Sequence, residues 1–200
     1  MEGRKSFFNE AAGTWDERFY TAELAVFLEK LVSKFGLKLG QNVLDVGTGT
    51  GLLIPFLLKA IGTSGSITAI DYAEKMVQIC KSKHSHKKNV TIILQDVEEL
   101  DLQSASFDIA VCFGLFPHLA HKERTLLHLK NVLKHGGKLI IAHALSSAEI
   151  KAHHNRSPSP IANDVLPEKL EMWRMLKRVG FTRIFIKDKP GCYLSISIKP

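Results

Sequence analysis

The chain has 200 residues, of which 45% are hydrophobic and 24% charged, and its formal net charge is +7. This length suits one α/β domain with a substantial core rather than two domains. No apolar run approaches the roughly 20 residues of a membrane-spanning helix, and the amino terminus lacks the apolar core of a secretion signal. Three isolated cysteines, Cys80, Cys112 and Cys192, predict reduced core residues of a cytoplasmic protein.

Residues 1–36 are expected to form an amino-terminal helical cap. Five aromatic side chains stand among polar residues at its start, namely Phe7, Phe8, Trp15, Phe19 and Tyr20. This segment either covers a ligand as a flap or packs as a plain cap on the sheet, and the sequence leaves both open. Apolar residues then recur at helical spacing over residues 24–35, which predicts a helix that ends at Gly36.

The rest of the chain is organised around residues 42–53. A short apolar strand containing Asp45 runs into Gly47, Gly49 and Gly51, and an apolar run follows over residues 52–60. Strand, glycine turn and helix form the first half of a nucleotide-binding βαβ unit. The glycines let the backbone turn tightly and approach a ligand closely, because they carry no Cβ and tolerate positive φ.

The spacing of these glycines argues against NAD, and hence against an oxidoreductase. The dinucleotide pattern is Gly-x-Gly-x-x-Gly, whereas here the third glycine comes one residue early and Leu52 stands in its place. Asp45 would repel a pyrophosphate but suits a ligand with a cationic end, such as a sulfonium. Twenty residues after Gly51, the next predicted strand ends in Asp71, an acid placed to accept hydrogen bonds from both ribose hydroxyls.

Residues 43–51, together with Asp71, resemble the class I S-adenosylmethionine-dependent methyltransferases. Residues 129–139 also closely resemble the family's sequence at the same place, and the resemblance covers about residues 37–200. It implies S-adenosylmethionine as the cofactor and S-adenosylhomocysteine as the product. It also implies a three-layer α/β sandwich whose seven-stranded sheet is parallel except for the last strand. The short Lys189-Pro190-Gly191 link independently predicts that the last two strands are antiparallel.

By this resemblance, the cofactor-binding residues follow the ends of successive strands. They are Asp45, Gly47, Thr48, Gly49, Thr50 and Gly51 at the methionine part, Asp71, Tyr72 and Met76 at the ribose, Asp96 and Val97 at the adenine, and Cys112, Phe113 and Gly114 on the far side. Two of these roles have open alternatives. Asp96 can instead be a helix N-cap, and Met76 can be a core residue of its helix.

The remaining elements alternate as the fold requires. The pattern predicts strands at residues 90–94, 107–113, 138–144, 181–187 and 193–199, and helices at residues 73–83, 126–133 and 170–179. Between them, residues 146–166 keep no clear period. We expect this insert to contribute to acceptor recognition, because members of the family commonly build substrate-binding elements there.

Three histidines are the candidate catalytic residues. His118 follows the fourth predicted strand and His143 nearly ends the fifth, so both are expected to face the mouth of the site, while His154 lies in the insert. Imidazole titrates near neutral pH, which suits a base or a substrate anchor. Each could also be an ordinary structural histidine. No metal site is expected, because no His-x-x-x-His pattern or clear carboxylate partner accompanies them.

The sequence therefore predicts a methyltransferase that acts on a small-molecule acceptor, as a monomer or homodimer. An RNA-modifying or RNA-binding protein remains an alternative because of the basic cluster at residues 81–88, and so does a cofactor-binding regulator without catalysis. The cluster has no interleaved aromatic residues on which bases could stack. Cations at the end of a predicted helix also have a plain structural role, since they complement its dipole.

Overall fold

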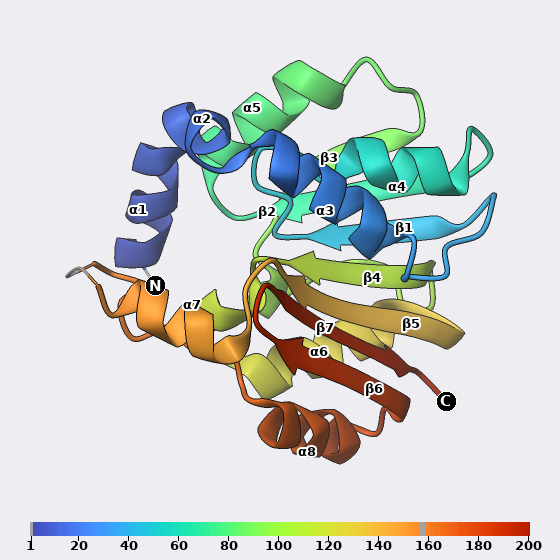
Figure 1. The fold of residues 1–200 in the computed structure, drawn as a ribbon. Coiled ribbons are helices and arrows are strands. Elements are labelled where there is room, and N and C mark those ends of the chain that lie inside the picture. Colours follow the sequence, from blue (N-terminus) through green and yellow to red (C-terminus); the bar gives the residue numbers. More distant parts are fainter. Residues whose placement is uncertain (1, 157–158) are drawn as a thin grey trace.

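The computed structural model describes residues 2–156 and 159–200 and shows one sheet between two layers of helices (Figure 1). The strands are β1 (Asn42–Val46), β2 (Ser66–Asp71), β3 (Val90–Leu94), β4 (Phe107–Phe113), β5 (Leu133–His143), β6 (Thr182–Lys189) and β7 (Cys192–Ile198). Their order in the sheet is β3-β2-β1-β4-β5-β7-β6. Only β7 runs against the others, pairing antiparallel with both β5 and β6. The predicted α/β fold is confirmed.

The helices cover the two faces of the sheet in groups of three. One face carries α3 (Ala22–Val32), α4 (Ile54–Ile61) and α5 (Glu74–His84), and the other carries α6 (Lys122–Val132), α7 (Ser147–His154) and α8 (Lys169–Val179). The leader forms α1 (Glu2–Ala11), the turn η1 (Ala12–Thr14) and α2 (Trp15–Phe19), and it packs against α5. Two further helical turns, η2 (Val97–Glu99) and η3 (Phe116–His118), follow β3 and β4.

The core consists of two apolar clusters separated by the sheet. Successive side chains of a strand point to opposite faces, so Val43 packs with α3 and α4 while its neighbour Leu44 packs with α6 and α8. Because both faces are covered, the central strands β1 and β4 place apolar residues on both faces rather than on alternate positions only. The three cysteines are buried and form no disulfide among the described residues.

The structure departs from the predicted elements in two places. β5 begins at Leu133 instead of residue 138, because Leu133 pairs with Phe107 across a register shift and Gly136 allows the intervening turn with a φ of 75°. The insert at residues 146–166 contains α7, which the periodicity did not predict. A capping box starts this helix: the Ser146 hydroxyl accepts from the Glu149 N–H, and the Glu149 carboxylate accepts from the Ser146 N–H.

No helix within residues 2–156 and 159–200 combines the length and the apolar character that crossing a membrane requires.

Candidate cofactor and acceptor site

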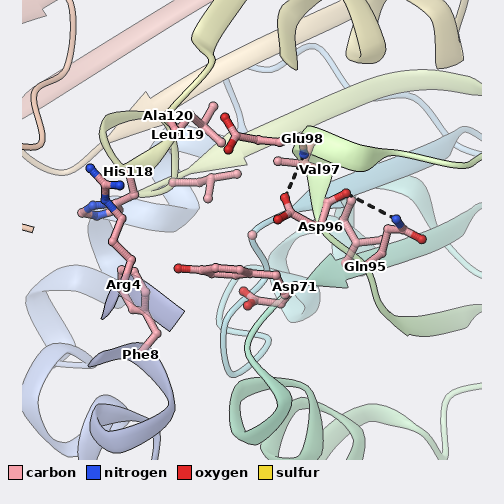
Figure 2. A pocket seen from close by; sticks show the side chains of 14 residues that line it. Arg4, Phe8, Asp71, Gln95, Asp96, Val97, Glu98, His118, Leu119 and Ala120 are labelled. Carbon is pink, nitrogen blue, oxygen red and sulfur yellow. Dashed lines mark hydrogen bonds between the residues drawn. The ribbon is translucent and has the colours of Figure 1, made fainter. Parts of the chain in front are cut away.

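A pocket lies beyond the carboxyl ends of the first four strands, where ligands bind in open parallel sheets (Figure 2). Its walls come from five segments. Four of the segments lie at the ends of strands, and the fifth is α1. The residues are Gly47 after β1; Ile70, Asp71 and Tyr72 at the end of β2; Gln95, Asp96, Val97 and Glu98 after β3; Leu115, His118, Leu119 and Ala120 after β4; and Arg4 and Phe8 in α1. Figure 2 shows Asp71, Gln95 and Asp96 on one side of the pocket and Arg4, Phe8 and His118 opposite them.

The glycine turn has the conformation that its sequence predicts. Gly47, Gly49 and Gly51 have φ values of 67°, 55° and 86°, a region that favours glycine. A Cβ on Gly51 would lie 2.5 Å from the ring of His84, so α5 packs directly against the turn. The turn can therefore pass close to α5 at Gly51 and to Leu115 at Gly47 only because these two residues carry no side chain.

Asp45 forms a hydrogen bond with Thr48 of this turn. The hydroxyl of Thr48 donates to its Oδ2 at 2.7 Å, and the backbone N–H of Thr48 donates to the carbonyl of Ile70 at 2.9 Å. The Asp45 side chain is buried, and this burial raises its pKa to about 6. Asp45 does not line the pocket as it stands, so the expected contact with the methionine part of the cofactor stays a prediction.

Asp71 connects the glycine turn to the pocket. Its Oδ2 accepts from the N–H of Gly49 at 2.8 Å and its Oδ1 from the N–H of Ala73 at 2.9 Å. Burial raises the pKa of this carboxyl, while the hydrogen bonds from backbone N–H groups oppose the rise. Each oxygen keeps a second lone pair, and the residue lines the pocket. Asp71 is thus suited to accept from the two hydroxyls of a ribose.

Asp96 is a helix N-cap, and its expected contact with adenine stays a prediction. Its Oδ1 accepts from the N–H of Glu98 at 2.8 Å and so caps η2, and the residue also lines the pocket. Apolar side chains beside it, from Ile70 and Val97, can cover the faces of a planar ring. Carboxylates for hydroxyl and amino donors, together with apolar walls for a ring, fit the adenosine part of the expected cofactor.

Other predicted cofactor residues lie outside this pocket. Met76 is buried under the glycine turn, Cys112 and Phe113 pack into opposite clusters of the core, and Gly114 bonds through its N–H to Ala142. Thr50 donates to Asp16 of the leader at 2.5 Å. Because the last side chains of β4 alternate between the two cores, the residue that reaches the pocket after this strand is Leu115.

The leader combines the two functions that the sequence could not separate. It caps α5, because Asn9 donates to the Glu74 carboxylate and accepts from the Lys75 N–H, both at 2.9 Å. It also covers the pocket, because Phe8 and Arg4 form one of its walls. The aromatic content of the leader indicated such a cover, but nothing in the sequence indicated Arg4.

Of the three candidate histidines, only His118 lines the pocket. Its ring centroid is 5.2 Å from those of both Phe8 and His154. His154 lies behind it and donates from Nδ1 to the carbonyl of Asp164 at 2.6 Å. His143 accepts on Nδ1 from the N–H of Leu145 at 3.1 Å, and burial lowers its pKa to about 4. The expectation that His143 faces the same mouth is therefore not supported.

Asp164 is the residue of this region that the sequence did not indicate. Its carboxylate accepts from Arg4 of the leader and from His118, and thus joins three segments that are far apart in the chain. Local periodicity carries no signal for such a contact. Within the described part of the chain, no three or more His, Cys, Asp or Glu side chains are grouped so that they could hold a metal ion.

Comparisons with known proteins agree with this geometry. A family model described as a methyltransferase domain matches residues 43–137. The demethylmenaquinone methyltransferase of Staphylococcus aureus is 33% identical over 116 residues, which make up 58% of this chain and 48% of that protein. The chain thus spans about half the length of the curated relatives that it matches.

Solved structures extend the likeness to nearly the whole chain. An S-adenosylmethionine-dependent methyltransferase from Aquifex aeolicus superposes with a TM-score of 0.72 and 28% identity over 86% of this chain and 89% of its own. A Thermotoga maritima methyltransferase, titled as a possible histamine N-methyltransferase, shares the fold with a TM-score of 0.75 and 20% identity over 96% and 98% of the two chains. The family match, the curated relatives, the solved structures and the strand order together support a likeness to the class I S-adenosylmethionine-dependent methyltransferases, a family whose cofactor is S-adenosylmethionine.

Proposed function

We propose that the protein transfers a methyl group from S-adenosylmethionine to a small hydroxylated aromatic acceptor that binds between α1 and η3. The observation that carries this proposal is the composition of the pocket. Asp71 and Asp96 stand on its cofactor side, Phe8 and His118 face them, and Leu115 also lines the pocket. An acceptor held against these residues would lie next to the cofactor, in the close approach that methyl transfer requires.

Two observations support a small, ring-shaped acceptor. The α1 helix closes over the pocket, with Phe8 packed edge-on against His118, so an acceptor must fit under this cover. The acceptor side also offers the ring of Phe8 and the apolar Leu115 and Leu119 beside the polar His118 and Arg4, which suits a flat molecule with a hydroxyl. The Staphylococcus aureus relatives, named for a quinone substrate, agree with this class of acceptor.

Methyl transfer from labelled S-adenosylmethionine to naphthohydroquinone tests the proposal. We expect a labelled naphthalene product with the wild type. We also expect its loss with Leu119→Glu, because the added carboxylate would occupy the apolar wall of the pocket. The control is Leu127→Glu, since Leu127 is exposed on α6. No labelled product with the wild type, or equal product with both variants, would contradict the proposed function.

A further inference from the structure

We propose that Asp164 is a positioning residue that holds His118 with its proton on Nδ1, so that Nε2 takes a proton from the methyl acceptor. This inference rests on the proposed methyl transfer and narrows the acceptor to molecules whose nucleophile arrives protonated. A methyltransferase needs such a base only for these acceptors. An acceptor that already presents a free lone pair requires no proton transfer before it attacks.

Hydrogen bonds to both the side chain and the backbone of Asp164 hold this residue in place. Its carboxylate side chain is 2% exposed and has Oδ2 at 2.9 Å from Nδ1 of His118. Arg4 donates from Nε to both carboxylate oxygens, at 3.0 and 2.9 Å. The backbone N–H of Asp164 donates to Ile161 at 3.0 Å, and its carbonyl accepts from His154. The carboxylate therefore has little freedom to turn away from His118.

The charge on Asp164 decides which nitrogen of His118 carries the proton. Burial acts to raise the pKa of Asp164, but the hydrogen bonds from His118 and Arg4 outweigh it and bring the pKa to about 2. An ionised carboxylate only accepts hydrogen bonds, so Nδ1 of His118 must donate. In a neutral imidazole the other nitrogen then has a free lone pair. Nε2 is thus the ring nitrogen with a free lone pair, and it belongs to a residue that lines the pocket.

His118 is also held in the neutral form that a base needs. Burial lowers its pKa, and the carboxylate of Asp164 opposes this shift without overcoming it. The charged and titratable groups around the ring come from α1, the insert, the end of β5 and the start of α6, and are Arg4, Asp164, His154, His143 and Lys122. Neighbouring cationic groups add to the effect of burial, because they disfavour a second positive charge.

The other two histidines are arranged differently. Because Nδ1 of His143 accepts from a backbone N–H, its neutral ring carries the proton on Nε2 and has no second lone pair to offer. His154 donates to the Asp164 carbonyl and does not line the pocket. The arrangement of carboxylate, Nδ1–H and free Nε2 is the one by which an acid orients a histidine base in other enzymes.

The proposed reaction breaks one O–H bond and one carbon–sulfur bond and forms one bond to the methyl carbon. When bound, S-adenosylmethionine supplies the methyl group and keeps the electron pair of the broken carbon–sulfur bond. The O–H bond of the acceptor breaks, and its proton passes to Nε2 of His118. The electron pair left on the acceptor forms the new bond to the methyl carbon. Asp164 stabilises the resulting imidazolium, which returns its proton to solvent after the product leaves.

Long-range proton–nitrogen correlation spectra on protein with isotopically labelled histidine test the position of the proton without any ligand. Signals of His118 are assigned with His118→Gln. We expect the wild type to show His118 as the Nδ1–H form at neutral pH. In Asp164→Asn we expect its titration midpoint to fall by about one pH unit, because an opposite charge that favours the imidazolium is lost. The Nε2–H form in the wild type, or an unchanged midpoint in Asp164→Asn, would overturn the proposal.

Arg4→Gln is the matched variant, because Arg4 is the other side-chain partner of Asp164. Removing this cation should raise the midpoint of His118 while the proton stays on Nδ1, which is the opposite direction to Asp164→Asn. If Asp164→Asn does not fold, as judged by circular dichroism, Arg4→Gln decides. An unchanged titration midpoint of His118 in Arg4→Gln would then contradict the proposal that His118 and Arg4 share the carboxylate of Asp164.

The acceptor class has its own test, with naphthohydroquinone and its dimethyl ether as probes. We expect labelled methyl transfer to the first compound and none to the second, whose oxygens have no proton to lose. Equal transfer to both, or transfer to neither, would overturn the assignment of a protonated acceptor. Calorimetry with S-adenosylmethionine distinguishes failure of the proposed function from failure of the proposed role of Asp164. Failure of the wild type to bind it would refute the proposed function whatever the ring nitrogens of His118 show.

Discussion

The carboxylate of Asp71 accepts a hydrogen bond from the backbone N–H of Gly49 at 2.8 Å, so the acid that ends β2 fixes the turn that follows β1. The same carboxylate faces the pocket. The shape of the turn and the predicted recognition of a ribose therefore depend on the same side chain. A change at Asp71 should affect the stability of the protein as well as its affinity for the cofactor.

Asp71→Asn should lower both quantities. The amide keeps one oxygen that can accept an N–H, but its NH₂ group would face the other N–H, and a buried hydrogen bond left unmade costs about 1–3 kcal/mol. We expect a loss of this size in the free energy of unfolding, measured with denaturant, together with weaker binding of S-adenosylhomocysteine. Asp101→Asn is the control, because Asp101 is exposed and outside the pocket. Equal stability of the two variants would contradict the coupling.

The close contact between the glycine turn and α5 gives a second prediction. Gly51→Ala combines a φ of 86° with a Cβ 2.5 Å from the His84 ring, whereas Gly136→Ala has a φ of 75° and no atom within 4 Å of its Cβ. Both variants should lose roughly 1–2 kcal/mol in the free energy of unfolding, because alanine disfavours a left-handed backbone conformation. Gly51→Ala should lose a further 1–3 kcal/mol, roughly, from overpacking. Thermal unfolding of the two variants measures this difference, and similar losses would show that the turn can move away from α5.

The buried Asp45 predicts a specific dependence of stability on pH. Its pKa in the folded protein is about 6, so the folded state holds a proton that the unfolded chain has already released between about pH 4 and 6. This contribution of Asp45 therefore destabilises the fold as pH rises through that window. Asp45→Asn removes it, so the stability of the variant relative to the wild type should increase by up to about 3 kcal/mol across this range.

Unfolding with denaturant at a series of pH values measures this effect. The control is Thr48→Val, which removes the hydrogen bond to Asp45 but keeps the buried carboxyl. Its stability should still fall with rising pH, at least as steeply as that of the wild type. If Asp45→Asn and the wild type respond to pH alike, the carboxyl of Asp45 does not hold a proton in the folded protein.

The two strand-end histidines should differ sharply in activity. His118→Gln removes the proposed base, and general-base catalysis contributes about 10²- to 10⁴-fold to a rate, so kcat with naphthohydroquinone should fall by a factor in this range. His143→Gln should keep most of its activity, because His143 lies outside the pocket and bonds to Leu145. Affinity for S-adenosylmethionine should change little in either variant. A larger loss of kcat for His143→Gln than for His118→Gln would contradict the assignment of His118 as the base.

Much of the fold was predictable because local signals agree with the buried sheet. The apolar runs of β3 and β4 were predicted with their observed bounds, and the glycine turn and Asp71 lie where their spacing predicts. The α7 helix was missed because it has little apolar face, with Ile150 as its one buried large apolar residue. The spacing of Ser146 and Glu149 was a signal for its start that the periodicity could not supply.

Of the residues that line the candidate site, Asp71, Asp96 and His118 were predictable from the sequence, but the contact between Arg4 and Asp164 was not. Asp71 and Asp96 follow strands whose ends meet at one edge of the sheet, so their convergence follows from the topology. Arg4 and Asp164 meet across 160 residues of sequence. Neither has a neighbouring motif that indicates the other, because their contact depends on how the leader and the insert pack over the finished sheet. The contact of Arg4 with Asp164 therefore became visible only in three dimensions.

Calorimetric titration with S-adenosylmethionine, S-adenosylhomocysteine and NAD, on the wild type and on Asp96→Ala, tests the central claim most directly. Asp96 lines the pocket and, through its side chain, caps only a short turn, so its replacement should leave the fold intact. We predict that the wild type binds the first two compounds and not NAD, and that Asp96→Ala binds them more weakly. Binding of NAD in their place, or unchanged affinity in Asp96→Ala, would contradict the account.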